Sequence, residues 1–528
     1  MSIPEISGEL LIGRRSVRAA LAPFRAIDPA TGLELDIAFG TASDEHVALA
    51  ASLAGEAFDA FRSTSAQQRA DLLERIAQDI ADLGPALIDL AVRETGLPKA
   101  RLEVERNRTV NQLRLFAKIV VEGSWMTAAL DSPLPERTPP RPDLRLRKIA
   151  LGPVAVFGAS NFPLAFSVAG GDTAAALAAG CPVVVKAHGA HPGTSELVGR
   201  VIQRAVAAAN LPEGVFSMLQ GDGRTVGVAL VRHPAIKAVA FTGSRQGGVA
   251  LMREAARRDE PIPVYAEMSS VNPVFVFPET MAANAAAIAK GFIDSLVVNS
   301  GQLCTNPGLI IAVEGAAIGA FRAAVVDAVQ RNTGGAMLTP GIQAAYQDAV
   351  QTRQAHAGVK LLARGSCGPA ACDGQAALFE TDAATFLADK SLEGEIFGAS
   401  SLIVLCRDVA EMSEVAEHIE GQLTATMFLA EADYQAAAAF IPILERKAGR
   451  IIVNGYPTGV EVSHAMVHGG PYPATSDSRT TSVGATAIDR FLRPVSYQNV
   501  PGVLLPEAVK DGNPLSLWRI RDGELQRA

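Results

Sequence analysis

Hydrophobic residues recur at helical spacing between residues 43 and 125. In ASDEHVALAASLAGEAFDAF, Ser43 or Asp44 comes just before the first apolar positions and is a suitable helix cap. The segment SAQQRADLLERIAQDIADLG repeats this pattern and ends at Gly84, and LEVERNRTVNQLRLFAKIV is a third amphipathic segment. We therefore expect this part of the chain to be helical.

From residue 151 the pattern changes to short apolar runs separated by helical segments. The runs PVAVFGAS, CPVVVKAH, GVFSMLQG and AIKAVAFTG are typical of buried strands. Helices are expected in AGGDTAAALAAG, SELVGRVIQRAVAAAN and GRTVGVALVRH between them. This alternation predicts an α/β fold with a doubly wound, Rossmann-like parallel sheet, which binds ligands at the carboxyl ends of its strands.

Three other stretches of the sequence indicate where the expected domains begin and end. DSPLPERTPPRPDLRLRKIA is rich in proline and charge, which excludes a helix and predicts an extended arm. A second α/β stretch follows residue 277, and AIDRFLRPVSYQNVP after residue 485 predicts a strand outside both cores.

Composition limits the classes of partner. A chain of 528 residues with 48% apolar and 19% charged residues predicts a globular protein of two or three domains. The net charge of −8, without a basic stripe, argues against nucleic acid or a membrane as partner. Five cysteines, an odd number, and an N-terminus without a signal pattern indicate a cytoplasmic protein. Cys367 and Cys372 lack partners at zinc spacing, so we expect no metal.

Two polar residues follow expected strands. Asn161 comes just past PVAVFGAS, where an asparagine is ordinarily a turn or cap residue. Lys186 ends CPVVVKAH, and a lysine leaving a buried strand must reach solvent or an anion such as a phosphate.

Three further positions could carry chemistry. In FTGSRQGG, Ser244 could cap a helix whose N-terminus holds phosphate, although the motif alone is weak. Glu267 is the only acid in VYAEMSSVNPVFV, so burial could raise its pKa toward that of a general base; the alternative is a salt-bridged acid at a strand end. Cys304, in NSGQLCTNPG, is by itself more typical of a buried thiol than of a nucleophile.

In their order along the chain these elements resemble the aldehyde dehydrogenase superfamily. The series is Asn161, Lys186, FTGS at 241–244, Glu267, Cys304 and EGEIFGA at 393–399, and the resemblance covers nearly the whole chain. Within the superfamily, FGASNFPLAFSVAGGDTAAALAAGCPVVVKAHGAHPGTSE and HGGPYPATSDSRTTSVG are similar to the 2,5-dioxopentanoate (α-ketoglutaric semialdehyde) dehydrogenases, with NADP-dependent fatty aldehyde dehydrogenases as near relatives.

The resemblance implies the aldehyde dehydrogenase fold, with a homodimer or homotetramer built through small oligomerisation strands. The implied division is a dinucleotide-binding domain at 1–135 and 150–276, a catalytic domain at 277–484, an oligomerisation arm at 136–149 and 485–500, and a C-terminal extension at 501–528.

The resemblance also implies roles for single residues. Cys304 attacks the aldehyde as a thiolate, Asn161 and the Cys304 N–H stabilise the oxyanion, and Glu267 activates the water that hydrolyses the thioester. The implied cofactor site comprises Lys186, Gly189, Arg224, Phe241, Thr242, Gly243, Ser244, Gly248, Glu395 and Phe397.

Departures from the family pattern bear on the cofactor. Gly189 stands where many relatives have an acid that binds the adenosine 2′-hydroxyl, and Arg224 resembles the arginine that contacts a 2′-phosphate. We therefore favour NADP over NAD, with a solvated loop arginine as the alternative for Arg224. The usual Glu-Leu-Gly-Gly-Lys is replaced by Glu267-Met268-Ser269-Ser270-Val271, so bulkier residues follow the base.

The substrate is expected to be a small aldehyde that carries a carboxylate. Arg108 falls where the superfamily's helix faces the substrate tunnel and could clamp that carboxylate; the alternative is a surface salt bridge with Glu105. Phe162, Thr305 and Pro457 resemble residues that line the tunnel. The expected reaction is oxidation of 2,5-dioxopentanoate to 2-oxoglutarate. The alternatives are a medium- or long-chain fatty aldehyde dehydrogenase and, more remotely, a non-catalytic structural member; coenzyme A acylation is disfavoured by Glu267.

Overall fold

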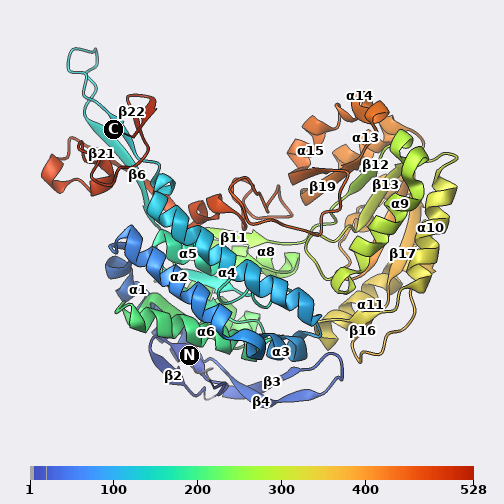
Figure 1. The fold of residues 1–528 in the computed structure, drawn as a ribbon, viewed down its shortest axis with the longest axis horizontal. Helices are drawn as coiled ribbons and strands as arrows, with labels where there is room; N and C mark the ends of the chain where they lie inside the picture. The colour runs from blue at the N-terminus through green and yellow to red at the C-terminus, as the bar shows by residue number, and fades with distance from the viewer. Residues whose placement is uncertain (1–4, 20, 528) are drawn as a thin grey trace.

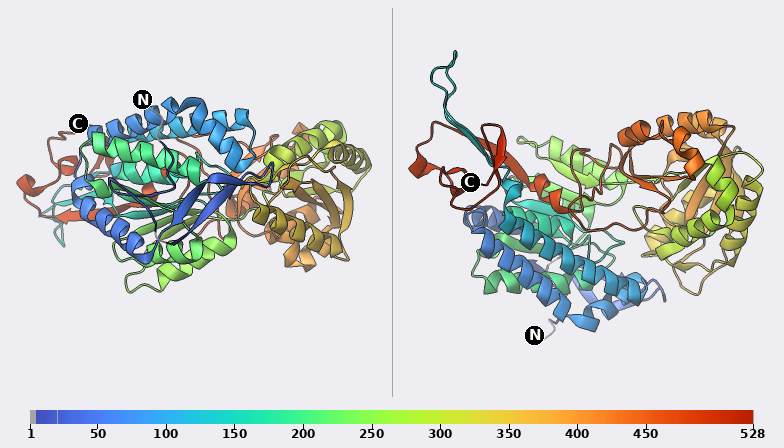
Figure 2. Two further views of the ribbon diagram at one scale, coloured as in Figure 1. Left: turned by 90° about the horizontal axis from the view of Figure 1, so that it is seen from below. Right: turned by 45° about the horizontal axis from the view of Figure 1, so that its top comes forward.

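The computed structural model describes residues 5–19 and 21–527. Two α/β bodies lie side by side, and a slender arm projects from the first body, away from the second (Figure 1). Figure 2 shows that the arm and the C-terminal segment lie together on the outer side of the first body. The α/β class agrees with the expectation from the sequence.

The first body is built on a sheet with the strand order β11-β10-β7-β8-β9-β1-β2. From β11 to β9 the strands are parallel, and β1 and β2 add antiparallel strands at one edge. The strands are β1 (Leu10–Ile12), β2 (Arg15–Val17), β7 (Val154–Phe157), β8 (Val183–Lys186), β9 (Phe216–Leu219), β10 (Ala238–Thr242) and β11 (Val264–Glu267). The predicted strands of residues 151–243 are confirmed, whereas the two N-terminal strands were not predicted.

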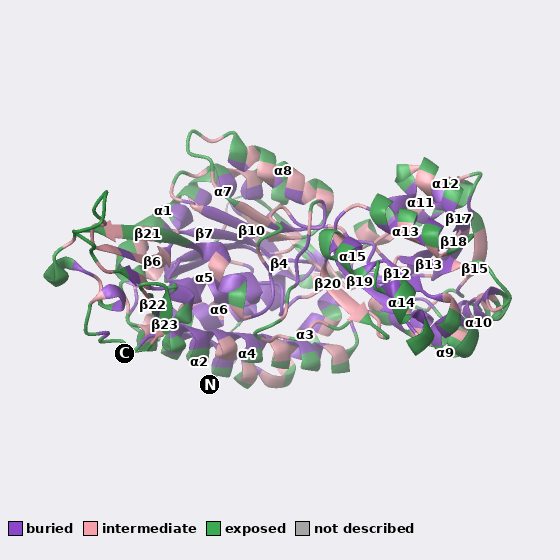
Figure 3. Ribbon diagram, turned by 90° about the horizontal axis from the view of Figure 1, so that it is seen from above, coloured by how far each residue is buried: buried purple, intermediate pink, exposed green. Residues whose placement is uncertain are grey.

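Helices cover both faces of this sheet, which makes it doubly wound. They are α1 (Asp44–Arg62), α2 (Ala66–Asp82), α3 (Gly84–Thr95), α4 (Lys99–Glu122), α5 (Gly171–Ala179), α6 (Pro192–Ala208), α7 (Val228–Arg232) and α8 (Arg245–Ala256). Alternate strand residues face opposite layers: Val154 and Val156 pack with α2 to α6, and Ala155 and Phe157 pack with α1, α7 and α8. The strands are buried and the outer helix faces exposed (Figure 3).

The helix caps follow the sequence signals. Ser43 caps α1 and Ser65 caps α2, each with a capping box. At Gly223–Gly227, where an ordinary helix was expected, the chain forms one π-helical turn capped by Asp222 before α7 begins.

The second body has the strand order β15-β17-β18-β13-β12-β19-β20, parallel except for the edge pair of β15 and β17. Its strands are β12 (Val274–Val276), β13 (Leu309–Val313), β15 (Lys360–Arg364), β17 (Ala377–Asp382), β18 (Ser400–Cys406), β19 (Gln422–Phe428) and β20 (Ala448–Val453). Its helices are α9 (Pro278–Val297), α10 (Ile318–Arg331), α11 (Pro340–Ala355), α12 (Ala383–Ala388), α13 (Val409–His418), α14 (Tyr434–Ala437) and α15 (Ile441–Lys447).

The stretch Pro278–Gly301 is the one helical stretch among the described residues that is long and apolar enough, by length and composition, to cross a membrane. Phe292, Ile293 and Leu296 from this stretch pack against β12 and β13. The same hydrophobicity is therefore used to cover a sheet of the second body.

The arm is larger than expected, because the C-terminal segment is part of it. Its sheet has the order β21-β6-β5-β22-β23, with β5 (Ala129–Asp131), β6 (Leu144–Ala150), β21 (Leu492–Gln498), β22 (Arg519–Arg521) and β23 (Glu524–Gln526). The arm thus begins near residue 129, not 136, and the described residues 501–527 do not form a separate extension. The reason is that β22 pairs with β5, a contact that no local pattern predicts.

A hairpin of β3 (Leu21–Ile27) and β4 (Glu34–Thr41) reaches from the first body to the second (Figure 1). At its tip the carbonyls of Pro29 and Ala30 accept hydrogen bonds from the N–H groups of Cys372 and Ala371. Ala371 and Cys372 come just before β16 (Asp373–Gly374), which pairs with β14 (Gly335–Ala336), so the hairpin joins the two bodies at a second point.

A buried carboxylate on α4 holds the loop that carries Asn161. Glu105 is 3% exposed, and its Oε1 accepts hydrogen bonds of 2.8 and 2.9 Å from the N–H groups of Leu164 and Ala165. Its Oε2 lies 2.6 Å from Nη1 of Arg101, whose Nη2 donates to the Asn161 carbonyl. Helix α4 thereby fixes this loop at the carboxyl end of β7.

We expect Glu105→Ala to lower the free energy of unfolding by about 3 kcal/mol, because it leaves Arg101 and two buried N–H groups without their partner. The midpoint of urea unfolding measures this change. Glu103→Ala, at an exposed position of the same helix, is the control. Equal midpoints for the two variants would contradict the proposed importance of Glu105.

Candidate active site

The carboxyl ends of the first sheet bring together residues that are far apart in sequence. Lys186 pairs in register with Phe157, and Glu267 pairs with Thr242. Because these strands are parallel, Lys186, Thr242 and Glu267 lie along one edge of the sheet, which is where such folds bind ligands.

Cys304 lies in the loop between α9 and β13, and its backbone carbonyl accepts a hydrogen bond from a side chain. The Nδ2 of Asn272 donates to the carbonyls of Cys304 and Asn306 at 2.9 Å each. Gly301, at φ +70°, packs on the Gly398 backbone, where a Cβ would come within 2.2 Å of a carbonyl carbon. The glycine of NSGQLC is thus required by close backbone packing of the nucleophile loop.

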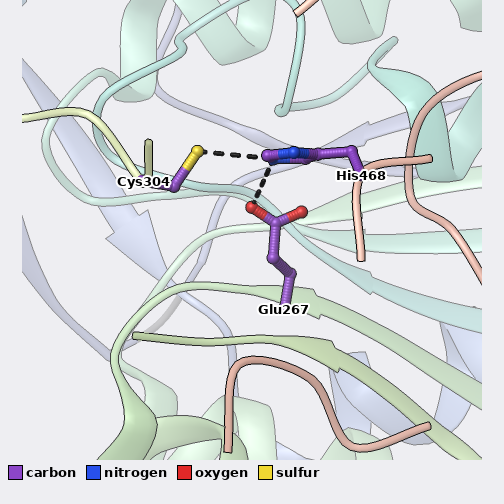
Figure 4. A group of neighbouring side chains, drawn as sticks. All are labelled: Glu267, Cys304 and His468. Carbon is purple, nitrogen blue, oxygen red and sulfur yellow. Dashed lines mark hydrogen bonds and ion pairs between the residues drawn. The ribbon is translucent and has the colours of Figure 1, made fainter. Parts of the chain in front are cut away.

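Glu267 and His468 meet at the sulfur of Cys304 (Figure 4). The His468 Nε2 lies 3.4 Å from Cys304 Sγ and 2.8 Å from a Glu267 carboxylate oxygen. The other oxygen of Glu267 accepts a 2.5 Å hydrogen bond from the Ser482 hydroxyl. Glu267 and His468 are 2% and 1% exposed, so this cluster is shielded from bulk water.

The electrostatics of the cluster favour a neutral thiol and an ionised carboxylate. Burial and the negative charge of Glu267 raise the pKa of the Cys304 thiol well above its ordinary value, with Arg108 opposing them. Burial acts to raise the pKa of Glu267, but His468 and the Ser482 hydroxyl outweigh it, so that the pKa is lowered. The expectation that burial would raise the pKa of Glu267 is therefore wrong, because its hydrogen-bond donors dominate.

Cys304, Glu267 and His468 also have the donor types of a metal site. Their ligand atoms lie within 4.8 Å of one another. The expectation that the protein needs no metal stays a prediction.

Asn161 lies next to the nucleophile loop. It is 7% exposed, and its Nδ2 donates to the Gln302 carbonyl at 3.0 Å. An amide nitrogen carries two N–H groups, so the second remains to stabilise negative charge on an oxygen bound at Cys304.

The residues expected to hold a dinucleotide surround the sheet edge, and they fit one. Burial lowers the pKa of Lys186 to about 8, with Asp222 opposing the shift. Ser244 caps α8, whose first turn follows the exposed Gly243. A Cβ on Gly243 would lie 2.7 Å from the Phe241 ring, and one on Gly248 would lie 2.6 Å from Met268. These close contacts place the start of α8 against the strands, ready to receive a phosphate.

The residues expected at the adenosine end are exposed. Gly189 has open space, since the nearest atom to an added Cβ is 4.0 Å away on Phe24. The Arg224 side chain is exposed and forms no ion pair within the described part of the chain. The structure is consistent with both interpretations of Arg224.

Glu395, another residue expected at the cofactor, is occupied by protein contacts. The Glu395 carboxylate is hydrogen bonded to the Ser269 hydroxyl and the Ser270 N–H, while burial raises its pKa to about 7. Phe397 lines a small cavity of about 20 Å³ beside Glu395 and Gly301. Ser269, which replaces the usual glycine, therefore binds the Glu395 carboxylate.

Arg108 does not form the expected alternative salt bridge. Glu105 is engaged by Arg101, and the Arg108 guanidinium carbon lies over the rings of Phe162 and Phe166 at 5.9 and 5.3 Å. Its Nε and Nη2 are buried without a hydrogen-bond partner. The Phe166 ring in turn lies 6.1 Å from that of His468. Arg108 is thus linked to Cys304 through one phenylalanine and one histidine.

The other expected tunnel residues are less open. Thr305 is 2% exposed, and Pro457 is buried with its carbonyl bonded to Arg450. Phe162 is half-buried and packs edge-on against Phe166. Of these three residues, Phe162 is the one that shares an aromatic surface with Arg108.

His468 and Ser482 are the functional residues that the sequence did not single out. Both belong to the irregular segment 465–484, which returns from the second body to the end of β11. The sequence contained only an indirect indication of His468. It is the first residue of HGGPYPATSDSRTTSVG, a segment that resembles one branch of the superfamily.

The chain is similar to known proteins over most of its length. The aldehyde dehydrogenase family model matches residues 17–486. The chain is 54% identical over 524 residues to alpha-ketoglutaric semialdehyde dehydrogenase 2 of Azospirillum brasilense, covering 99% of this chain and 100% of the relative. It is 46% identical to alpha-ketoglutaric semialdehyde dehydrogenase of Acinetobacter baylyi, covering 99% of each.

Among solved structures, aldehyde dehydrogenase C of Pseudomonas syringae in complex with NAD⁺ and octanal aligns with a TM-score of 0.79 at 19% identity. The alignment covers 94% of this chain and 97% of that one, and it shows a shared fold. With a family match over most of its length and relatives this similar, the chain belongs to the aldehyde dehydrogenase family.

Proposed function

We propose that this enzyme oxidises 2,5-dioxopentanoate (α-ketoglutaric semialdehyde) to 2-oxoglutarate with NADP as the favoured acceptor. Arg108 is the main support for a substrate with a carboxylate. Its guanidinium rests on aromatic rings near Cys304, and two of its buried nitrogens have no hydrogen-bond partner. An unpaired cation in an apolar tunnel is costly unless an anion binds there. The names of the two relatives support the same substrate.

The reaction begins with the thiol proton of Cys304. Because the thiol is neutral in this state, sulfur needs a base, and the His468 Nε2 at 3.4 Å and the Glu267 carboxylate are the neighbouring acceptors. The same His468 nitrogen, Nε2, faces both Cys304 and Glu267. It therefore either accepts the thiol proton of Cys304 or donates a hydrogen bond to the carboxylate of Glu267. Sulfur then forms a bond to the aldehyde carbon, and the electron pair of the C=O bond moves to oxygen beside the Asn161 amide.

Bound NAD(P)⁺ supplies the acceptor for the hydride that aldehyde oxidation releases. Lys186, Ser244 and the start of α8 would hold it at the edge of the first sheet. Glu267, ionised because its pKa is lowered, then takes a proton from water, and the hydroxide adds to the thioester on Cys304. The carbon–sulfur bond breaks, the carboxylic acid leaves, and the proton held by Glu267 returns to sulfur, which restores both the thiol and the carboxylate.

NADP is favoured by the open space at Gly189 and by the exposed cation of Arg224. A carboxylate at position 189 would repel a 2′-phosphate, and glycine removes that repulsion. We also propose a cytoplasmic homodimer or homotetramer, since β21 is an edge strand of the arm and offers its free side to a second copy.

Arg108→Ala should raise KM for 2,5-dioxopentanoate by about 30-fold or more, the loss expected for a charge-assisted hydrogen-bonded pair, and leave hexanal unchanged. Arg114→Ala, on the same helix but paired with Glu74, is the matched control. The measurement is a steady-state rate panel of 2,5-dioxopentanoate, succinate semialdehyde, hexanal and decanal with NAD and NADP. A higher kcat/KM for hexanal or decanal in the wild type would favour the fatty aldehyde alternative.

Affinity for NADP should fall as the pH rises above 8, by about tenfold per pH unit at the limit of one proton. The pKa of Lys186 is lowered to about 8 in the free enzyme, so a bound phosphate must pull a proton onto the lysine above this pH. Titration calorimetry between pH 7 and 9.5 measures the change. Lys186→Arg, which keeps its charge, should remove the pH dependence; its persistence in this variant would assign it to another group.

His468→Gln should slow alkylation of Cys304 by iodoacetamide at pH 7 by roughly 10-fold or more, because the thiol loses the ring nitrogen that lies 3.4 Å from its sulfur as a proton acceptor. The difference should vanish at high pH, where the thiol ionises without help. The second-order rate constant is followed from pH 6 to 10, with Ser482→Ala testing the far side of Glu267. Superimposable pH profiles for wild type and His468→Gln would show that Glu267 alone accepts the proton.

A further inference from the structure

A second arginine lies at the substrate side of the site, on a strand of the second body. Arg450, in β20, donates from Nη1 to the Gly459 carbonyl and from Nη2 to the Pro457 carbonyl, each at 2.6 Å. Its Nε is buried and has no hydrogen-bond partner. The guanidinium is therefore fixed by two contacts, and one donor remains unused.

The loop that Arg450 holds packs on the same hydrophobic cluster as Arg108. Its residues Val460, Val462 and Met466, together with Phe162, pack against a small core that contains Phe166, and Arg108 rests on the rings of Phe162 and Phe166. Arg450 is close enough to the reacting sulfur and to Arg108 for both to affect it: after burial lowers its pKa, Cys304 raises the pKa and Arg108 lowers it further. Arg108 of α4 thus contacts this aromatic cluster directly, and Arg450 of β20 holds the loop that packs on it.

Neither arginine has a carboxylate partner among the described residues. By contrast, Arg101 pairs with Glu105 and Arg490 pairs with Asp172, at 2.6 Å each. Proteins rarely bury two like charges near each other without an anion, because the unpaired charges cost free energy. The pair is therefore built for a ligand that brings negative charge and further acceptors.

The free donors differ between the two arginines, and this difference specifies the ligand. Arg108 has two unpartnered nitrogens, Nε and Nη2, which match the two oxygens of a carboxylate. Arg450 offers its single Nε–H, which suits one neutral acceptor. A 2-oxo acid presents this combination, a carboxylate with a carbonyl oxygen on the next carbon.

We propose that Arg450 determines specificity for 2-oxo semialdehydes by donating its Nε–H to the 2-oxo oxygen, while Arg108 holds the adjacent carboxylate. This inference rests on the proposed function, because it assumes that the aldehyde carries a carboxylate. It goes further in naming the residue that separates 2,5-dioxopentanoate from 5-oxopentanoate, which has a methylene in place of the 2-oxo carbon.

The test compares kcat/KM for 2,5-dioxopentanoate, 5-oxopentanoate and hexanal in wild type and Arg450→Lys. Lysine keeps the positive charge and can still reach a loop carbonyl, but it lacks the Nε–H. We expect kcat/KM for 2,5-dioxopentanoate to fall about tenfold, as for one lost hydrogen bond, with the other two substrates within about twofold of wild type. Arg446→Lys, an exposed arginine on α15, is the matched control.

Inhibition provides a second readout. 2-Oxoglutarate and glutarate differ by the same carbonyl, and both are measured as inhibitors of hexanal oxidation. In Arg450→Lys the preference for 2-oxoglutarate over glutarate should fall about tenfold. An unchanged ratio of inhibition constants, or an equal loss for all three substrates, would overturn the inference and leave Arg450 as a loop anchor only.

Different results would contradict the proposed function and the proposed role of Arg450. A wild-type enzyme that prefers hexanal to both acids contradicts the proposed function, whatever Arg450 does. A wild-type enzyme that prefers the acids, but whose discrimination between them is unaffected in Arg450→Lys, contradicts this inference alone. Arg108→Ala should weaken both acids to a similar extent, because both carry the carboxylate that Arg108 binds.

Discussion

Glu267 ends β11 with its carboxylate shielded from water, and an ionised carboxylate in such a place is tolerated only when donors surround it. The chain provides them by returning in segment 465–484, which brings His468 and Ser482 onto the two carboxylate oxygens. The same segment continues the sheet edge, since Thr475 bridges Glu267 and Ser476 bonds to Ala266. Satisfying one buried charge therefore also attaches the second body to the first.

The hydrogen bonds that stabilise Glu267 also affect the protonation state of the nucleophile, Cys304. The donors that keep Glu267 ionised place a negative charge beside Cys304, and that charge helps keep the thiol protonated. Arg108 opposes it from the substrate side, so the balance at sulfur depends on whether that guanidinium is free or paired. A carboxylate bound at Arg108 would neutralise part of this opposing charge, so substrate binding places greater demand on the base that removes the thiol proton.

Local sequence patterns predicted many helices and strands of this molecule. They missed the features that form only where distant parts of the chain meet. The buried strands of residues 151–243 and the helix cap at Ser43 follow from neighbouring residues, whereas Asn161, Glu267 and Cys304 were singled out by their order along the chain and the family resemblance it carries. His468 could not be found in this way, because its segment has no period and its role arises only where it meets β11. The C-terminal strands were missed for the same reason, since β22 pairs with β5 across almost the whole chain.

The two serines after the base show how a departure from the family pattern alters the site. Ser270 Oγ accepts from the Leu423 N–H and contacts the side chain of Asn272, which in turn holds the Cys304 carbonyl. Gln422, at the start of β19, accepts from the backbone N–H groups of Val271 and Asn272. The backbone after Glu267 and the loop of Cys304 are thus fixed to one strand of the second body. In such a site the base moves by rotation of its side chain and not by displacement of its backbone, so the distance between base and sulfur is set by rotamers. This rigidity suits a carboxylate that must first meet a thiol and later a water molecule at nearly the same point.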